Sequence, residues 1–504
     1  GTFWALTMTY NILYWAKVNR YLQMNFNYKT QPFDHQRVAL EDSWSAKYYA
    51  LLMEMGTGKT KVALDTMSIL YEQNKIEACV VIAPKGVYDN WLRAEIPTHV
   101  PDGIERIILR WTPNSSQKYQ NEVKAFFEDD SGALKIFVVN TEAFSTARAT
   151  RIVYDFCKKH LNNLVIVDES TTIKNRKALR SKNIIELHKL SKYRRILTGS
   201  PITKSPMDLF SQCLFLDKNA LGFNSYYGFQ NRYSIVIKRT MGAKSFQEIT
   251  GYRRLDELTE KLESFSNRVL KKECLDLPDK LYIRRDVPIT DEQAKVYNQM
   301  KKLALAKLES GELVTTASVL TQIMRLQQIC CGFLQPDDGE IQALPNLRLE
   351  ALMEIAEDVQ GKAIIWATYT HDINRISTAL RERFGYNAVA TYYGATEQEE
   401  RQNIVNEFQE PDSELRFFVG QPKTGGYGIT LTAANTVIYF SNSYDLEIRL
   451  QSEDRAHRIG QKNPVTYIDL VTPYTIDEKI LDALKSKINI AGRVLKEDTK
   501  KWLM

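Results

Sequence analysis

The feature that most constrains this fold is the alternation of short β-branched runs with amphipathic segments of helical length. The first half of the chain has such runs at residues 78–83, 135–140, 164–168 and 195–198, and the second half at residues 363–367, 388–393, 417–419, 437–440 and 467–471. Apolar strands separated by helix-length segments are typical of parallel sheets with crossover helices. The sequence therefore predicts an α/β fold with two parallel-sheet lobes.

The length of 504 residues also favours at least two domains, because single cores seldom exceed roughly 250 to 300 residues. Residues 206–345 are predicted to be mostly helical, with clear helical periods over residues 291–308 and 317–329. Pro278 marks a linker at residues 275–280. The expected domains are an aromatic-rich segment (1–27), a first lobe (28–274) with a helical protrusion from about residue 206, a linker and second protrusion (275–345), a second lobe (346–474), and brace helices (475–504) beginning with residues 477–484.

Composition excludes several classes of protein. No stretch approaches the roughly 18 to 20 apolar residues of a membrane span, and the opening residues lack a basic leader, so a cytosolic or nuclear protein without a membrane partner is expected. The six cysteines show no CxxC spacing and are expected to be reduced thiols, most of them buried. The net charge of +6 suits a polyanionic partner but also an ordinary basic enzyme.

A candidate phosphate-binding loop lies at residues 53–60, Met-Glu-Met-Gly-Thr-Gly-Lys-Thr. Gly56 and Gly58 permit a tight turn whose amides face phosphates at the start of a helix. Lys59 would reach the β- and γ-phosphates, and Thr60 would ligate magnesium. Met53 occupies the position of the usual first glycine, so a chance Gly-Lys-Thr remains an alternative from the loop alone.

An acidic pair follows the apolar run that ends at residue 168. Asp168 and Glu169 would lie at the carboxyl end of a strand, where open α/β sheets bind ligands. Asp168 is a candidate magnesium ligand through water, and Glu169 a candidate general base. A solvated turn is the alternative for the pair by itself, and the presence of Lys59 makes the catalytic interpretation more specific.

Two further segments carry candidate nucleotide contacts. The amide of Gln36, close after Phe33, can donate to and accept from an adenine edge, although an ordinary surface residue is the alternative. In residues 451–461, helical spacing would place Gln451, Arg455 and Arg458 on one face. Such a face presents two guanidinium groups to a γ-phosphate, or it is simply a charged, solvent-exposed helix.

Taken in order, these segments resemble the Swi/Snf family of superfamily 2, the helicase-like DNA-dependent ATPases. The resemblance covers about residues 30–485. Its matching segments are residues 33–36, 55–60, 82–84 with Trp91, 168–175, 197–201, 324–330, 425–428 and 451–461.

The resemblance implies two RecA-like lobes that close on ATP and Mg²⁺ and move along double-stranded DNA. The catalytic residues would be Lys59, Asp168, Glu169, Arg455 and Arg458. The nucleotide contacts would be Phe33, Gln36, Met55, Gly56, Thr57, Gly58, Lys59, Thr60, Gly426, Gly428 and Gln451. The metal would be held by Thr60 and Asp168. DNA-facing candidates are Lys85, Asn140, Thr141, Lys174, Asn175, Ser181, Lys182, Tyr393, Gly394, Lys423 and Thr424. Contacts to phosphates predict little sequence preference, and a monomer on DNA is expected.

The chain departs from the family pattern at three places. Thr171 replaces the His that usually ends the acidic motif, Lys204 replaces a frequent Asn, and Tyr444-Asp-Leu446 replaces Trp-Asn-Pro. Hydrolysis should survive because Asp168 and Glu169 remain. These departures favour a compact, divergent member of bacterial or viral type, acting in the cytoplasm of a bacterial or virus-infected cell, or in the nucleus if eukaryotic.

The sequence leaves three functions open. The first is an ATP-dependent duplex-DNA translocase in repair, recombination, fork remodelling or displacement of bound proteins. The second is a strand-separating or strand-annealing helicase, which ranks lower because no wedge hairpin is recognisable between the motifs. The third is a DNA-clamping scaffold with a decayed ATPase. It is disfavoured because the chain retains all five candidate catalytic residues, Lys59, Asp168, Glu169, Arg455 and Arg458.

Overall fold

The structure is a computed structural model that describes residues 26–85, 87–113, 115–241, 244–271, 277–309, 316–336, 339–424 and 428–495. Most of the aromatic-rich segment therefore lies outside the described residues. The chain divides into two compact units. The first holds the described residues up to Ile202, Met207–Gln230 and those between Asp256 and Cys274; the second holds Thr203–Pro206, Asn231–Leu255 and the described residues that follow.

The first unit is built on a seven-stranded sheet whose pairs are all parallel, in the order β3-β4-β2-β5-β6-β1-β9. Its strands are β1 (Tyr48–Met53), β2 (Ala78–Ala83), β3 (Arg106–Arg110), β4 (Leu134–Asn140), β5 (Asn163–Asp168), β6 (Tyr193–Leu197) and β9 (Ser266–Val269). Strands β2 and β5 are buried along their whole length, as expected for parallel strands covered on both faces.

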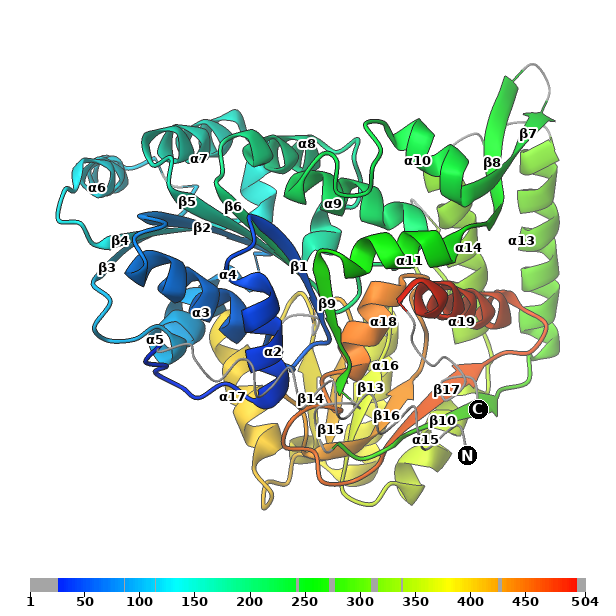
Figure 1. The fold of residues 1–504 in the computed structure, drawn as a ribbon. Coiled ribbons are helices and arrows are strands. Elements are labelled where there is room, and N and C mark those ends of the chain that lie inside the picture. The colour runs from blue at the N-terminus through cyan, green and yellow to red at the C-terminus, as the bar shows by residue number, and fades with distance from the viewer. Residues whose placement is uncertain are drawn as a thin grey trace, which may run out of the picture. The chain divides into compact units, whose positions relative to one another are not determined.

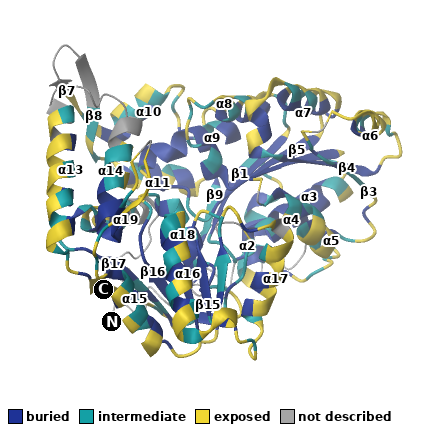
Figure 2. Ribbon diagram, turned by 180° about the vertical axis from the view of Figure 1, so that it is seen from behind, coloured by how far each residue is buried: buried dark blue, intermediate teal, exposed yellow. Residues whose placement is uncertain are grey.

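Helices cover both faces of this sheet (Figure 1). On one side lie α2 (Asp34–Ser43), α3 (Lys59–Glu72), α4 (Tyr88–Asn90) and α5 (Ile96–His99); on the other lie α6 (Gln117–Glu128), α7 (Ala147–Lys159), α8 (Leu179–Glu186) and α9 (Leu209–Leu216). Helices α10 (Tyr226–Tyr233) and α11 (Leu255–Glu263) follow. Helix α3 contributes eleven buried residues, so the phosphate loop at its start rests on the core (Figure 2).

The second unit is built on a six-stranded sheet, also parallel, in the order β10-β17-β16-β13-β15-β14. Its strands are β10 (Lys280–Asp286), β13 (Lys362–Trp366), β14 (Val389–Tyr392), β15 (Phe417–Gly420), β16 (Ala434–Tyr439) and β17 (Val465–Val471). Its helices are α13 (Asp291–Glu309), α14 (Thr316–Cys331), α15 (Arg348–Asp358), α16 (Thr370–Phe384), α17 (Gln398–Gln409), α18 (Leu446–Glu453) and α19 (Ile476–Leu495). The predicted fold class, α/β with two parallel-sheet lobes, is confirmed.

The prediction that residues 206–345 are mostly helical is wrong in part. Helices α13 and α14 are confirmed, but the region also contains an antiparallel hairpin of β7 (Ser234–Met241) and β8 (Lys244–Tyr252). It further supplies β9 and β10 to the edges of the two main sheets, and a short pair, β11 (Phe333–Leu334) with β12 (Gln342–Ala343). Edge strands carry few buried apolar residues, so their sequences lack the continuous apolar signal of central strands.

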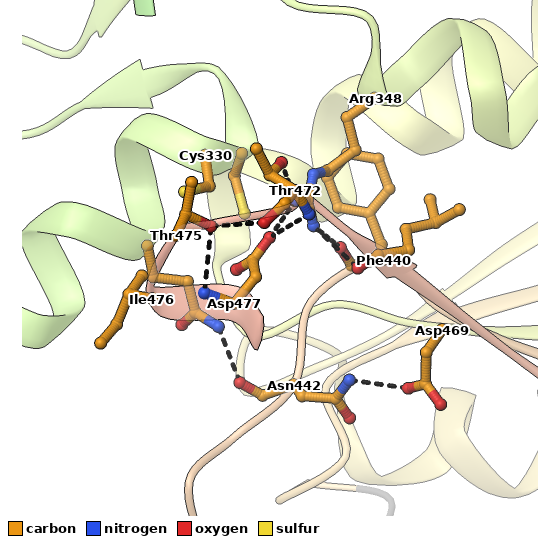
Figure 3. A network of polar contacts seen from close by, with 12 residues as sticks. Cys330, Arg348, Phe440, Asn442, Asp469, Thr472, Thr475, Ile476 and Asp477 are labelled. Atoms are coloured by element: carbon orange, nitrogen blue, oxygen red, sulfur yellow. Dashed lines mark hydrogen bonds and ion pairs between the residues drawn. The ribbon is translucent and has the colours of Figure 1, made fainter. Parts of the chain in front are cut away.

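Helix α19 is anchored to the second sheet through a buried arginine (Figure 3). The guanidinium of Arg348, which is fully buried, donates to the backbone oxygen of Phe440 at 2.7 Å, to Thr472 Oγ1 at 2.8 Å and to a carboxylate oxygen of Asp477. Asp477 lies in the first turn of α19, so one side chain ties the helix to the ends of β16 and β17. The helix predicted at residues 477–484 is thereby confirmed.

The cysteines and the hydropathy of the helices bear on two expectations from composition. Cys79, Cys157, Cys213, Cys330 and Cys331 are free and buried, as expected, while Cys274 lies outside the described residues. Among the described residues, no helix combines the length and apolarity that a bilayer crossing requires.

Candidate nucleotide and DNA sites

The candidate phosphate-binding loop connects β1 to α3. Gly56 and Gly58 have φ angles of +81° and +89°, the left-handed region that favours glycine. A Cβ on Gly58 would lie 2.0 Å from Nε2 of Gln36, so a larger residue would displace the Gln36 amide and strain the backbone. Gly58 also caps α3 and directs its free amides into the loop, which makes the loop a suitable cradle for phosphate.

Gln36 lies against this loop. Its Nε2 donates to the backbone oxygen of Thr57 at 3.1 Å, and its Oε1 accepts from the backbone N–H of Phe33 at 3.0 Å. His35 adds a second contact, with Nε2 2.7 Å from the same Thr57 oxygen. The Phe33 ring is 59% exposed and stacks on His35 at 6.0 Å between centroids. The structure thus brings Gln36 and an exposed aromatic ring to the loop, and their contact with adenine stays a prediction.

The acidic pair lies at the end of β5, beside the loop lysine. Nζ of Lys59 is 3.4 Å from Oε1 of Glu169, and both side chains are about nine-tenths buried. Glu169 has φ 46° and ψ 60°, a conformation that costs a non-glycine residue on the order of 1 kcal/mol or more. Strain of this kind persists where the surroundings determine it, and here it points the carboxylate toward the loop lysine.

Asp168 is held by two donors. Its Oδ1 accepts from the backbone N–H of Glu169 and its Oδ2 from the indole Nε1 of Trp91, each at 2.9 Å. Burial, followed by the charge of Glu169, raises the pKa of Asp168 to about 6, while Lys59 and the Trp91 hydrogen bond oppose the rise. A carboxylate fixed within electrostatic reach of Lys59 is the donor type that Mg²⁺ prefers.

Trp91 is a site residue that sequence reasoning matched to the family without assigning a role. It is fully buried and begins a π-helical turn, Trp91–Glu95. Such turns are rare and often occur at functional sites. The only signal in the sequence is the residue type, because a buried tryptophan needs an acceptor for its N–H.

A second residue that the sequence did not reveal is Gln212 on α9. Its Oε1 accepts from Ser170 Oγ at 2.6 Å, and its Nε2 donates to the backbone oxygens of Pro201 and Asp208, each at 2.8 Å. Gln212 and Ser170 are both fully buried. The amide therefore ties the residue that follows Glu169 to the segment that follows β6.

In the second unit, the two candidate arginine fingers lie beyond the end of α18, which corrects the expected helical face. Helix α18 ends at Glu453, so only Gln451 is helical. Arg455 is 1% exposed and Arg458 half-buried, and both donate to the backbone oxygen of Ile429, at 3.4 and 3.2 Å. Gly428, in the left-handed region at φ 81°, immediately precedes Ile429. Gly426 lies outside the described residues.

A buried charge network fixes α18. Arg449 forms hydrogen bonds from Nε to Glu453 Oε1 at 2.7 Å and from Nη1 to Asp469 Oδ1 at 2.6 Å. Its guanidinium carbon also lies 3.6 Å from the centroid of the Tyr439 ring. Glu453 is fully buried, and breaking such a network leaves an uncompensated charge, so the turn that carries Arg455 has a rigid base.

The candidate DNA-facing residues differ in exposure. Lys85, Asn175, Lys182, Gly394 and Lys423 are exposed, and Asn140, Lys174, Tyr393 and Thr424 are half-buried. Thr141 and Ser181, at 1% and 0% exposed, lie inside the protein because α8 packs against the turn Thr141–Ser145. Direct contact of these two hydroxyl groups with DNA is therefore not supported, since spacing in sequence does not reveal which side of a turn a neighbouring helix covers.

The loop that carries Tyr393 and Gly394 is held by Arg401 of α17. The Arg401 guanidinium donates to the backbone oxygens of Thr396 at 2.9 Å, Tyr393 at 3.2 Å and Gly394 at 3.3 Å. It also lies 5.6 Å from the centroid of the Tyr392 ring. Because one guanidinium donates hydrogen bonds to three backbone oxygens of this loop, the loop has a defined shape.

Comparison with known proteins identifies matching families in both halves of the chain. Residues 44–333 match the family of the SNF2-related domain, and residues 347–460 match the helicase conserved C-terminal domain. The chain is 27% identical to YwqA of Bacillus subtilis over 461 residues, which are 89% of this chain and 46% of that protein. It is 28% identical to the nuclear protein STH1/NPS1 of Saccharomyces cerevisiae over 468 residues, 88% of this chain and 33% of that protein.

The chain thus spans less than half the length of these relatives. Among solved structures, a SWI2/SNF2 ATPase core of Sulfolobus solfataricus in complex with dsDNA is 24% identical, with a TM-score of 0.41 and 95% of each chain covered. Because the SNF2-related domain alone matches more than half of the sequence, this chain belongs to the SNF2-related family.

Proposed function

We propose that this chain is an ATP-driven motor that moves along double-stranded DNA. The observation that carries the proposal is the 3.4 Å approach of Lys59 Nζ and Glu169 Oε1 at the start of α3. This contact brings a phosphate-binding lysine and a candidate general base to one point of the first unit. The name of one relative, YwqA, describes an ATP-dependent helicase/translocase, which supports the proposal.

In the proposed reaction, the loop amides between Gly56 and Lys59 bind the phosphates of ATP, and the Lys59 ammonium neutralises their charge. Thr60 and Asp168 hold Mg²⁺, which supplies charge neutralisation at the phosphates when bound. Glu169 accepts a proton from the attacking water. Phe33 and Gln36 contact the base, with Met55 and Thr57 completing the loop.

Arg455 and Arg458 act as arginine fingers on the same phosphates in this proposal, and Gly426, Gly428 and Gln451 complete the nucleotide contacts of the second lobe. The shared oxygen of Ile429 supports a common role, because it positions both guanidinium groups at one loop. Fingers that engage only in the hydrolytic state would couple turnover to lobe movement. The lobes would be those expected from the sequence, with boundaries at residues 28–274 and 346–474.

The partner is proposed to be the phosphate backbone of duplex DNA, bound without sequence preference. Exposed Lys85, Lys182 and Lys423 support this partner, since phosphate contacts from lysine carry no base information. Binding should weaken steeply with salt because each neutralised phosphate releases counterions.

The test is to measure ATP turnover beside duplex DNA, single-stranded DNA, forked DNA and duplex RNA of matched length. The proposal expects the largest stimulation from duplex DNA. Lys59→Ala should abolish turnover, whereas Lys47→Ala, which alters an exposed lysine away from the loop, should not. Equal turnover with and without every nucleic acid would reject DNA dependence.

Strand separation is the second candidate, and the β7–β8 hairpin is the observation that favours it. This hairpin forms a separate two-stranded sheet, and its β7 strand exposes Ile235 and Ile237, at 47% and 48%. Apolar side chains on a projecting ribbon can wedge between base pairs. Robust ATP-dependent unwinding of a forked duplex would place this activity first; its absence would leave translocation alone.

A further inference from the structure

The first unit carries an aromatic and basic cluster that contains none of the candidate site residues. The guanidinium carbon of Arg176 is 4.1 Å from the ring centroid of Tyr226 and 5.5 Å from that of Tyr227. The two tyrosine rings contact each other edge to face at 5.9 Å. Tyr227 is 61% exposed. These three residues are called the Arg176 platform.

The N–H donors of the Arg176 guanidinium are available to a ligand. Within the part of the chain that the structure describes, Arg176 makes ring contacts but no hydrogen bond or ion pair. Cation–π contacts fix the plane of the guanidinium without using its five N–H donors. A half-buried arginine oriented in this way is ready to bind an oxygen acceptor from another molecule.

The chain segment that carries Arg176 is strongly basic. Residues 174–182 carry five cations, Lys174, Arg176, Lys177, Arg180 and Lys182, and no acidic residue. Lys177 and Lys182 are exposed. Asp208 is an acidic neighbour, which acts on Tyr226 together with Arg176. Clustered cations of this kind attract a polyanion.

Residues of helix α9 contact both the platform and the basic segment beside it. Phe210 packs edge to face against Tyr226 at 5.6 Å between centroids, and the next residue, Ser211, donates to the backbone oxygen of Lys174 at 2.7 Å. Gln212 then bonds Ser170, which follows the acidic pair. Three successive residues of one helix thus fix the ring, the basic segment and the end of the catalytic strand, so the platform is preorganised.

We propose that the Arg176 platform binds the sugar-phosphate backbone of DNA. Arg176 donates to a phosphate oxygen, and the exposed Tyr227 ring packs against the adjacent deoxyribose. The inference rests on the proposed function and adds two contacts to it, those of Arg176 and Tyr227, neither of them among the candidates expected from the sequence. DNA fits better than an acidic protein because it offers both a phosphate for the guanidinium and an apolar sugar face for the ring.

The test separates charge from ring contact by measuring how the affinity for a blunt duplex depends on salt. Arg176→Ala should lower the slope of log K against log salt by about 0.9, the value for one lost phosphate contact. Tyr227→Ala should weaken binding roughly fivefold or more at an unchanged slope, because tyrosine is uncharged. Tyr227→Phe should bind as the wild type does. Lys118→Ala, an exposed lysine on α6 beside the edge strand β3, is the matched control with an unchanged slope.

Each outcome has a distinct meaning. If the wild-type protein fails to bind duplex DNA, the proposed function fails. If the wild type binds in a salt-dependent manner but Arg176→Ala keeps its slope and affinity, only the platform is rejected. Competition by polyglutamate as effective as that by an equally charged duplex would point to an acidic protein and also reject it. Thermal melting checks each fold; if Arg176→Ala melts early, Arg176→Gln, which retains an aliphatic stem and a planar end, carries the slope measurement.

Discussion

The guanidinium groups of Arg455 and Arg458 meet at one backbone oxygen, that of Ile429, at 3.4 and 3.2 Å. The shared acceptor orients both side chains, although α18 ends before either residue. Because a backbone oxygen holds them, moving the loop after Gly428 would move both guanidinium groups together. The pair is therefore expected to respond as a unit to the state of that loop.

Arg458→Ala should lower kcat roughly 10³-fold or more with little change in the KM for ATP, because a finger acts mainly in the transition state. Arg458 gives a cleaner measurement than Arg455, which is 1% exposed and whose loss would also destabilise the fold. Steady-state ATPase kinetics check this, with Arg383→Ala, which removes an exposed pair with Glu357, as control. An unchanged kcat would rule out the role of a finger.

Glu169→Gln should reduce hydrolysis by roughly 10² to 10⁴, the usual contribution of a general base, while ATP still binds. Gln has nearly the same shape as Glu and should fit the buried position beside Lys59, so nucleotide affinity serves as the internal check. Glu72→Gln, at the exposed end of α3, is the matched control. Normal turnover in Glu169→Gln would remove Glu169 from the mechanism.

Trp91→Phe should raise the Mg²⁺ concentration needed for half-maximal ATPase activity roughly tenfold, since it removes a hydrogen bond to a charged group. The hydrogen bond lowers the pKa of Asp168, so its loss raises that pKa above about 6. A protonated Asp168 cannot hold a cation, and the defect should be larger at pH 6 than at pH 8. Mg²⁺ titrations at both pH values measure this. Trp44→Phe is the control, and equal defects at the two pH values would contradict the account.

Gln212→Leu should lower the free energy of unfolding by about 1 to 3 kcal/mol, because Ser170 Oγ and two backbone oxygens lose their partner inside the protein. The substitution should also displace the acidic pair that precedes Ser170, and this displacement should reduce kcat on the order of tenfold or more. Adding Ser170→Ala removes the unpaired hydroxyl and should restore part of the stability. Melting curves and kcat of the two single variants and the double variant test this, and strictly additive effects would show that the two residues do not act together.

The central strands were predictable because their apolar runs are continuous. Strand β2 coincides with the predicted run at residues 78–83, and β5 begins one residue before the predicted residue 164. The approach of Lys59 and Glu169 follows from the same pattern, since β1 and β5 both flank β6 in a parallel sheet and end at the same edge. Residues at neighbouring strand ends are therefore the part of a site that a sequence reveals best.

Side-chain contacts across the fold were not predictable. Trp91 and Asp168 are 77 residues apart, and Ser170 and Gln212 are 42 apart, so no local pattern connects either pair. The candidate arginine fingers show the opposite failure, because helical spacing fits Gln451, Arg455 and Arg458 although the helix ends at Glu453. The residue at which a helix ends depends on tertiary contacts. Here Arg455 donates to the backbone oxygen of Ile429, in the loop after Gly428.

Displacement of a third strand from a DNA triplex by the moving protein is the most direct test of the central claim. Wild-type protein with ATP and Mg²⁺ should displace the third strand and leave the duplex paired. Neither Glu169→Gln with ATP nor the wild type without ATP should do so. ATP turnover stimulated by duplex DNA without any displacement, or displacement that does not need ATP, would contradict movement along the duplex.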